Sequence, residues 1–353
     1  MFNITLLEWF RENGRDLPWR QTRDPYAIWL SEIILQQTQV KQGWEYWERF
    51  MHHWPTVEAL ASATEDEVLR EWQGLGYYSR ARNLHYAAKQ IVALGHFPGT
   101  LAEIKQLKGV GDYTAAAIGS IAFGLPAAVV DGTVYRVLAR HFGIDTPINT
   151  TEGKKLFAAL AQELLLPNEA SAYNQAIMDF GAMQCTPQSP KCMECPLAES
   201  CEALRSGRVG ELPVKLKTLK VTERHLTYIY IRCQGQTAIH RRGPGDIWQG
   251  LWEPVLADEG MLSQLSTLLL PLKKNMKHVL THRVLYADFF LLETDERPTL
   301  PSDYIWIAEG DLDNYALPRL IEVLLSFLPK ECKFFVGNLL EWKKCITFAG
   351  QNE

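Results

Sequence analysis

The spacing of apolar residues changes near residue 210 of this chain. Before that point, apolar residues recur at helical intervals, with polar residues between them. The predicted helices lie around Trp9, ending at Gly14, and at 28–40, 46–54, 68–72 and 84–94. After that point, short β-rich runs are separated by charged, proline-containing segments. The predicted strands are 228–231, 237–239, 286–292 and 304–307, and the predicted helices are 263–272 and 317–328.

This pattern predicts an all-α region followed by an α+β domain. We place the helical region at 1–207, a basic linker at 208–224 and the C-terminal domain at 225–353. Bases outnumber acids in and around the linker, so it is either a solvated connection or a contact for a polyanion. Beyond about Pro329 the pattern predicts no more than a terminal strand and helix.

Composition and charge indicate a globular protein whose surface is not basic. The chain is 47% hydrophobic and carries a formal net charge of −5, so a nucleic-acid partner would need local basic patches and backbone amides. The longest apolar run, 115–130, is interrupted by Ser120 and Pro126 and is short for a membrane span. Residues 1–8 include an acid and no basic residue, so we expect a cytoplasmic protein without a targeting peptide.

Four of the seven cysteines lie close together in the sequence. They are Cys185, Cys192, Cys195 and Cys201. Thiolates at this spacing can surround one inorganic centre, either an iron–sulfur cluster or a tetrahedral zinc ion. Spacing alone favours iron–sulfur and leaves zinc, or neither, open. Disulfides are less favoured, because a chain of this length does not need covalent cross-links to fold.

A glycine-rich turn at about 107–115 joins two helical stretches. Gly109 and Gly111 let the backbone approach a partner closely, and the amides after them head a helix, which suits a phosphate oxygen. An ordinary interhelical turn has the same pattern. Downstream, Asp131 follows an apolar run and precedes a helix, so we expect it to be an N-cap. A carboxylate held by amide donors in this way stays ionised near pH 7.

The glycine turn, the Asp131 segment and the four-cysteine loop occur in the order found in the helix–hairpin–helix base-excision glycosylases of the endonuclease III superfamily. Within that superfamily, segments 29–40 and 74–84 resemble the adenine DNA glycosylases, the MutY family, which remove adenine mispaired with 8-oxoguanine. The resemblance covers 1–210 and implies two helical subdomains with a [4Fe–4S] cluster held at 185–201. The C-terminal domain is similar to the Nudix-like lesion-reading domain of that family, mainly through 247–254.

Two carboxyl groups are candidates for cleaving an N-glycosidic bond. Such cleavage needs one protonated group to assist the leaving base and one ionised group to hold an oxocarbenium-like sugar. Glu32 shares a helix face with Ile28 and Leu35, and desolvation there would raise its pKa, as a general acid requires. A surface glutamate is the alternative. Asp131 is the candidate for the ionised partner, and the resemblance implies these same roles.

Tyr113 distinguishes branches of the superfamily. Branches that also cut the DNA strand carry a lysine at this place, because an amine can form a Schiff base with the opened sugar, whereas a phenol cannot. We therefore expect base removal without strand cleavage, and the resemblance implies that Tyr113 also stabilises the charged intermediate. The alternatives are an endonuclease III-like enzyme with lyase activity, which Tyr113 opposes, and a non-catalytic lesion-binding protein, which Glu32 and Asp131 oppose. A Nudix pyrophosphatase would need a glutamate-rich helix that the sequence after Trp252 lacks.

The target base is hidden inside a duplex, so the enzyme must flip it out and fill the gap. Gln37 and Tyr77 are the candidate wedge residues, although each also fits a polar helix face or a core aromatic. Arg80 and Arg82 either reach phosphates or face solvent. The further expected DNA contacts are Leu75, Gly109, Gly111 and Thr133.

Two segments depart from the pattern of the family. Thr133 stands where an asparagine is usual, which keeps a hydrogen-bond donor but shortens its reach. Leu280, Thr281 and His282 replace the usual Phe-Ser-His, which keeps a hydroxyl and an imidazole and loses an aromatic ring. Thr281 and His282 are the expected lesion-recognition residues. The expected partner is double-stranded DNA with adenine opposite 8-oxoguanine or guanine, bound by a monomer that does not associate with membranes.

Overall fold

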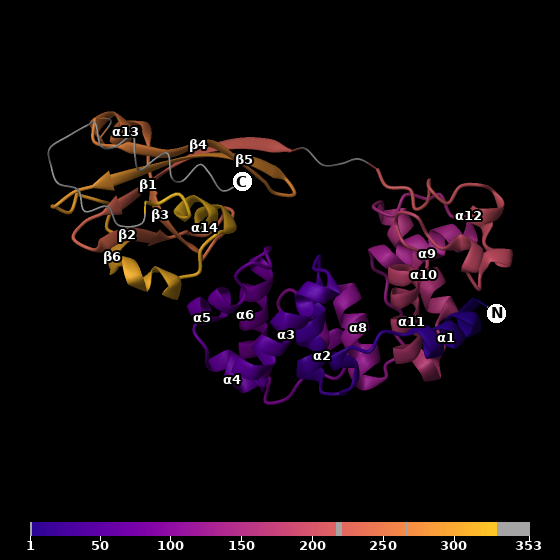
Figure 1. The fold of residues 1–353 in the computed structure, drawn as a ribbon. Helices are drawn as coiled ribbons and strands as arrows, with labels where there is room; N and C mark the ends of the chain where they lie inside the picture. The colour runs from indigo at the N-terminus through magenta and orange to yellow at the C-terminus, as the bar shows by residue number, and fades with distance from the viewer. Residues whose placement is uncertain (1, 217–220, 266, 330–353) are drawn as a thin grey trace. The chain divides into compact units, whose positions relative to one another are not determined.

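The computed structural model describes residues 2–216, 221–265 and 267–329 (Figure 1). Its contacts divide the chain into two compact units. The first contains the described residues up to Val221, together with Arg241–Trp252 and Gly310–Pro318. The second contains the remaining residues from Thr222 onward. The tail after Pro329, for which the sequence predicts a strand and a helix, lies outside the described residues.

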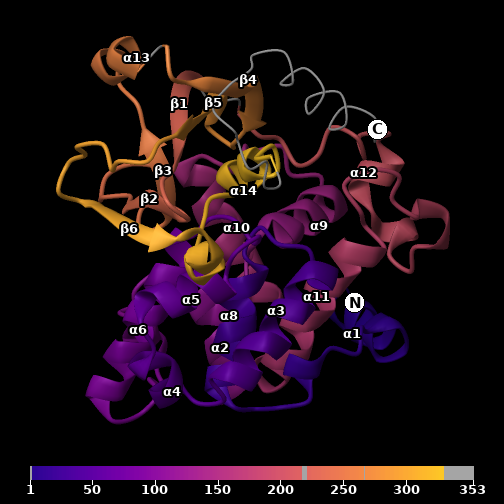
Figure 2. The ribbon, with the colours of Figure 1, turned by 60° about the vertical axis from the view of Figure 1, so that its left-hand side comes forward.

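The first unit is helical, as the sequence predicts. Its longer helices are α1 (Phe2–Asn13), α2 (Pro25–Leu35), α3 (Val40–His53), α6 (Ser79–Leu94), α8 (Asp112–Phe123), α9 (Gly132–Phe142), α10 (Thr151–Leu164) and α11 (Ala170–Met183). Shorter helices are α4 (Val57–Ser62), α5 (Glu65–Glu71), α7 (Leu101–Ile104) and α12 (Glu202–Arg205), with 3₁₀ turns that include η1 (Pro18–Arg20). Helix α2 packs against α3, α6 and α8, and α11 packs against α1, α8 and α9 (Figure 2).

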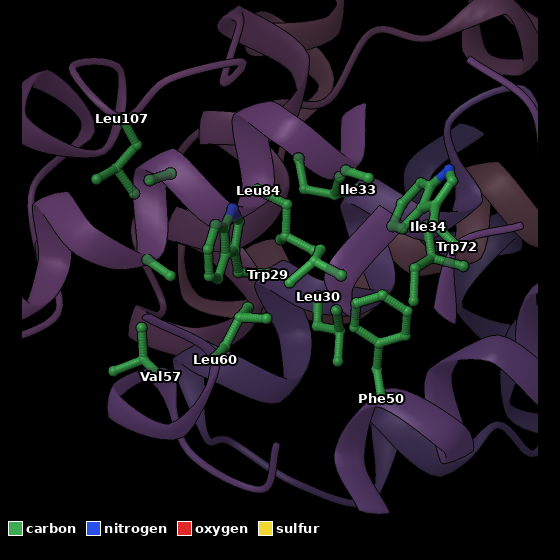
Figure 3. Close-up of a cluster of buried hydrophobic side chains, with 14 of the residues drawn as sticks. Trp29, Leu30, Ile33, Ile34, Phe50, Val57, Leu60, Trp72, Leu84 and Leu107 are labelled. Atoms are coloured by element: carbon green, nitrogen blue, oxygen red, sulfur yellow. The ribbon is translucent and has the colours of Figure 1, made fainter. Parts of the chain in front are cut away.

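Two apolar clusters form the core of this unit. The first is centred on α2, whose side chains Trp29, Leu30 and Ile34 pack against Phe50 and Trp72 (Figure 3). The second joins α1, α8, α9, α10 and α11. Helix α8 contributes to both clusters, with Ala115 and Ile118 in the first and Ala116 and Ala117 in the second, and it packs against α2, so the two helical groups meet at α8.

Helix α2 is shorter than the pattern predicts. The sequence predicts a helix at 28–40, but α2 ends at Leu35 and α3 begins at Val40. The intervening residues are polar, and Gln37 has a left-handed backbone with φ of 58°. At its N-terminus, the Asp24 side chain accepts a hydrogen bond from the Tyr26 amide, so α2 begins with a cap as well as a proline.

The second unit is built on a mixed sheet of order β4-β5-β1-β3-β2-β6. The strands are β1 (Thr222–Arg232), β2 (Gln236–Arg241), β3 (Trp252–Leu256), β4 (Leu270–Val279), β5 (Arg283–Glu293) and β6 (Tyr304–Ala308). Strand β1 runs parallel to β5, whereas β4 is antiparallel to β5 and β2 to β6. A small apolar core includes Ile229 and Ile231 of β1 and Val255 of β3.

Two expectations for this unit need correction. The helix predicted at 263–272 is found earlier, as α13 (Glu259–Leu265), and Leu270 already begins β4. The apolar run 268–272 is compatible with the spacing of a helix and with that of a strand. Its last residues form a strand because they pair with β5. Strand β3 was not predicted at all. The helix predicted at 317–328 is present as α14 (Arg319–Leu325). None of the helices in the described part of the chain has the length and apolarity needed to cross a membrane.

Candidate active site

Glu32 lies on α2, where almost every neighbouring side chain is buried. Its side chain is only 8% exposed, and its Oε2 accepts a hydrogen bond of 2.9 Å from the Tyr113 hydroxyl on α8. Burial, together with the nearby Asp131 charge, raises the pKa of Glu32 to about 7, although the Tyr113 bond and the charge of Arg20 oppose the rise. Glu32 can therefore hold a proton near neutral pH and release it, as the sequence predicts for a general acid.

Asp131 is the N-cap of α9, as predicted. Its Oδ1 accepts from the Val134 amide at 2.7 Å, and the amide and hydroxyl of Thr133 also bond to its carboxylate. Burial raises the pKa of Asp131 above its ordinary value despite these donors and the charge of Arg136. Amide donors alone would lower the pKa of Asp131, as expected from the sequence, but burial outweighs them and the net shift is upward. The shorter Thr133 side chain still reaches the carboxylate.

Tyr113 connects α8 to both α2 and α11. Its hydroxyl donates to Glu32 and lies 3.7 Å from the Met178 sulfur on α11. Burial and the charges of Glu32 and Asp131 raise the pKa of Tyr113 well above its usual value, so the phenol keeps its proton. The structure thus brings together the three residues predicted to be catalytic, from three different helices.

A buried ion-pair network behind Glu32 was missed by the sequence analysis. Asp179 on α11 is fully buried and accepts from Arg15 at 2.9 Å and from Arg20 at 2.7 Å and 2.9 Å. These bonds fix the guanidinium of Arg20, whose charge acts on Glu32. A single acid within the apolar run Ile177-Met178-Asp179-Phe180 is the signal that could have identified this network.

Thr133 and Gly181 make a close contact beside Asp131. A Cβ at position 181 would lie 2.2 Å from Cγ2 of Thr133. The carbonyl of Gly181 also accepts a 2.7 Å bond from Arg136, whose Nε bonds to the Cys185 carbonyl at 2.8 Å. The start of α9 therefore fits against α11 only because residue 181 has no side chain.

The predicted hairpin joins α7 to α8. Gly109 has a φ of 81°, and a Cβ there would lie 2.8 Å from the Cβ of Asn83, so only glycine fits. Gly111 is the N-cap of α8, and both glycines are exposed. The amides at the start of α8 are consequently open to an anion, as expected for a phosphate contact.

Of the side chains expected to contact DNA, some are exposed and others are buried. Gln37 and Tyr77 are exposed, Tyr77 by 49%, and neither is a core residue. Leu75 is 8% exposed and packs in the first apolar cluster, so it does not present a wedge. Arg80 is buried and donates to backbone carbonyls, which corrects the expectation that it reaches phosphate or solvent. Arg82 lies two residues further along α6 and is partly buried.

The four-cysteine loop follows α11. Its four cysteines form no disulfide and line one cavity together with Arg140, whose Nη1 lies 3.4 Å from the sulfur of Cys185. Burial, reinforced by the charges of the other three cysteines, raises the pKa of the Cys195 thiol to about 11. Four thiolates lining one cavity need bound cations to be stable together, and a donor set made only of soft sulfur fits an iron–sulfur cluster.

The expected lesion-reading residues are in the second unit, on the turn between β4 and β5. Thr281 and His282 are exposed there, and the Leu280 amide bonds to the Arg283 carbonyl at 2.8 Å. The linker bases are partly neutralised in the structure. Arg205 pairs with Glu202, and Arg208 pairs with both Asp145 and Glu211.

Comparison with known proteins identifies three regions. Residues 30–163 match the HhH-GPD superfamily of base excision DNA repair proteins, and 227–326 match the NUDIX domain. Residues 185–201 match the iron–sulfur binding domain of endonuclease III, so the cofactor of this loop is a [4Fe–4S] cluster. A solved thermostable thymine-DNA glycosylase has 32% identity and a TM-score of 0.54, covering 58% of this chain and 95% of that one.

Curated relatives decide the family. An adenine DNA glycosylase of Buchnera aphidicola subsp. Baizongia pistaciae is 33% identical over 299 residues, which cover 82% of this chain and 85% of that protein. The chain belongs to the adenine DNA glycosylase family. The Homo sapiens adenine DNA glycosylase is 45% identical over 213 residues, which cover 57% of this chain. The alignments span only 39 to 44% of the length of the human, rat and mouse members of the family.

Proposed function

We propose that this protein is a monofunctional DNA glycosylase that hydrolyses adenine from duplexes in which it is mispaired with 8-oxoguanine or guanine, in base excision repair. The proposal rests on one observation, which is that Glu32, Tyr113 and Asp131 lie together in one buried site. Action as a monomer on chromosomal DNA in the cytoplasm is part of the same proposal.

The first chemical step would be departure of the base. Protonated Glu32 donates its proton to a ring nitrogen of the flipped adenine, and the electron pair of the glycosidic bond leaves with the base. A pKa of about 7 suits this donor, because a large fraction of Glu32 side chains is then protonated at physiological pH. Tyr113, bonded to Oε2 of Glu32, holds that carboxyl in one orientation.

The sugar left behind is an oxocarbenium-like cation. Asp131, held by Val134 and Thr133, stabilises that cation or adds to its carbon. Glu32, now ionised, then takes a proton from water, and the water oxygen adds to the same carbon; where Asp131 has bonded to that carbon, this bond breaks as water adds and its electron pair returns to the carboxylate. The step returns Glu32 to its protonated form and leaves an abasic site with an intact backbone.

The proposed DNA contacts are made by groups that are exposed in the structure. The amides after Gly109 and Gly111 face a phosphate, and Gln37 and Tyr77 fill the space of the flipped base. Thr281 and His282 read the opposite base from the second unit. The four cysteines bind the cluster, which supplies iron–thiolate bonds that fix the loop after α11.

Duplexes carrying adenine opposite 8-oxoguanine, guanine or thymine test the proposal. We expect abasic sites with 8-oxoguanine and guanine and little reaction with thymine. Strand breaks should appear only after alkali or heat, and borohydride should trap no protein–DNA adduct, because Tyr113 supplies no amine. Breaks without alkali, with a trapped adduct, would instead support the lyase alternative.

A further inference from the structure

Arg80, the second residue of α6, is a buried cation without a buried anion. Its side chain is 7% exposed, and among the described residues no ion pair joins it to a carboxylate. Burial lowers the pKa of its guanidinium to about 10, so it is charged at neutral pH. Burying a charge is costly unless polar groups surround it, and here those groups are almost all backbone carbonyls.

One side of the guanidinium binds the end of α2. Its Nη1 lies 3.1 Å from the Ile33 carbonyl and 2.7 Å from the Ile34 carbonyl, and it also bonds to the Gln36 carbonyl. The hydroxyl of Thr38 is 3.2 Å away. The last carbonyls of a helix lack partners within the helix and carry partial negative charge, so a cation is stabilising there.

The other side binds the loop before α6. Nη2 lies 3.4 Å from the Leu75 carbonyl and 3.2 Å from the Gly76 carbonyl. The guanidinium carbon also lies 5.0 Å from the ring centre of Trp72 and 5.7 Å from that of Tyr77. Trp72 is part of the apolar cluster around α2 (Figure 3). Its indole nitrogen donates to the same Gly76 carbonyl at 3.1 Å.

These two anchored segments carry the two exposed wedge candidates. Gln37 follows the Gln36 carbonyl directly, and Tyr77 follows the Gly76 carbonyl directly. Both have left-handed backbones, with φ of 58° for Gln37 and 47° for Tyr77. Residues with side chains are strained in that region, and such strain persists only where the surroundings enforce it. Arg80 bonds to the residue immediately before each strained position.

We propose that Arg80 is a positioning residue that holds the Gln37 segment and the Tyr77 segment at one fixed separation, so that both side chains enter the duplex together. This inference rests on the proposed function, because it assigns the wedge role to Gln37 and Tyr77. Lysine cannot replace Arg80 in this role. A single ammonium presents its donors from one point, whereas the planar guanidinium directs Nη1 to one segment and Nη2 to the other.

The test combines Arg80→Lys with the double variant Gln37→Ala and Tyr77→Ala in a mutant cycle. Single-turnover excision of adenine opposite 8-oxoguanine and fluorescence of 2-aminopurine at the flipped position would be measured in all four proteins. We expect Arg80→Lys to slow flipping and excision at least roughly tenfold when the wedges are present, and less than about twofold when they are absent. Equal losses in both backgrounds would overturn the proposal, because they would mean that Arg80 acts only on folding.

Two further variants keep the test independent of folding. Thr38→Val removes one acceptor without disturbing the core, and we expect a smaller loss in the same two readouts. Arg49→Met is the matched control, since Arg49 also lies over a tyrosine ring and bonds to a carbonyl, but joins no wedge segment. Thr38→Val should therefore slow flipping and Arg49→Met should not. The opposite result would contradict the assignment.

Amide hydrogen exchange separates this inference from the proposed function. In Arg80→Lys we expect faster exchange at 36–38 and 75–77 than in the parent protein, with the rest of α6 unchanged. If the parent excises no adenine from any duplex, the proposed function fails while this exchange result still stands. If the parent excises adenine and Arg80→Lys matches it in exchange and flipping, only the role of Arg80 is wrong.

Discussion

Glu32 and Asp179 are both buried carboxylates on apolar helices of the first unit, yet their surroundings shift their pKa values in opposite directions. Burial raises the pKa of Glu32 to about 7, and a single phenol and a more distant arginine do not offset it. Burial also acts on Asp179, but its bonds to Arg20 and Arg15 outweigh it and lower the pKa. Burial by itself therefore does not set the ionisation of a carboxylate here. The number and charge of its donors decide the direction.

This contrast gives the two residues opposite effects on stability as pH changes. The pKa of Asp179 is lowered on folding, so its contribution is present above its unfolded value and is lost on acidification. The pKa of Glu32 is raised on folding, so its contribution is complete below its ordinary value of 4.5 and is lost as pH rises through about 7. One carboxylate holds the site together, and the other is kept ready to exchange a proton.

We expect the largest effect of all on removing Asp179, which tests whether this carboxylate stabilises the fold. Asp179→Ala leaves two arginines without their buried partner, so we expect the free energy of unfolding to fall by about 3–5 kcal/mol. Urea unfolding near pH 7 measures this. Glu169→Ala is the control, because its pair with Arg11 is 3.9 Å long and exposed, and should cost less than about 1 kcal/mol. Equal losses in the two variants would contradict a structural role for Asp179.

Removing the charge or proton of the two carboxyl groups that we propose to be catalytic should instead affect chemistry. We expect Glu32→Gln and Asp131→Asn each to slow single-turnover excision at least about a hundredfold, roughly 2.7 kcal/mol of barrier, while binding of the mispaired duplex persists. Glu8→Gln, an exposed acid on α1, should leave the rate unchanged. Near-normal excision by Asp131→Asn would show that the ionised partner lies elsewhere.

The pH dependence of the free energy of unfolding should further distinguish Glu32 from Asp179. Ionising Glu32 in its buried site is unfavourable, so Glu32→Gln should be more stable than the parent by roughly 3 kcal/mol near pH 8.5. Near pH 5 the carboxyl is protonated in the folded parent, and the difference should nearly vanish. Urea unfolding at the two pH values checks this. A stabilisation that is independent of pH would mean that the gain comes from packing and not from the proton.

The smallest effect is expected from exposed polar residues in the second unit. Thr281→Ala combined with His282→Ala should reduce the preference for 8-oxoguanine over guanine by roughly tenfold, because a few polar groups read the N7 hydrogen and the extra carbonyl. Adenine excision should persist, although more slowly. Rates and dissociation constants on the two duplexes measure it, with the exposed Ser302→Ala as control. An unchanged preference would place lesion reading in the helical unit.

Local features of the site were predictable from sequence. Asp131 was expected to be an N-cap because the signal lies within a few residues of it, and it caps α9. The burial of Glu32 followed from Ile28 and Leu35 on its own helix face, and the side chain is buried. The fold class was also correct, because helical and strand periods differ clearly on the two sides of residue 210.

Long-range features could not be predicted in this way. Arg15 and Asp179 are 164 positions apart, and no local pattern relates them. Arg80 lies near the start of a helix beside another arginine, which resembles a solvated face, and its inward direction depends on where α2 ends. The start of β4 was wrongly predicted to be helical, because a short apolar run can form a helix or a strand. Pairing with β5, which comes later in the sequence, makes it a strand.

The contact between Thr133 and Gly181 constrains the order in which substitutions can accumulate during evolution. With threonine at 133, any side chain at 181 would meet its methyl group at 2.2 Å, so a lineage that changes position 181 first passes through a damaged site. Thr133→Ser removes that methyl while keeping the hydroxyl that bonds to Asp131. An alanine at 181 therefore requires loss of the Thr133 methyl, and its Cβ would still lie 3.0 Å from Cγ2 of Val137, so we expect positions 133 and 181 to change together.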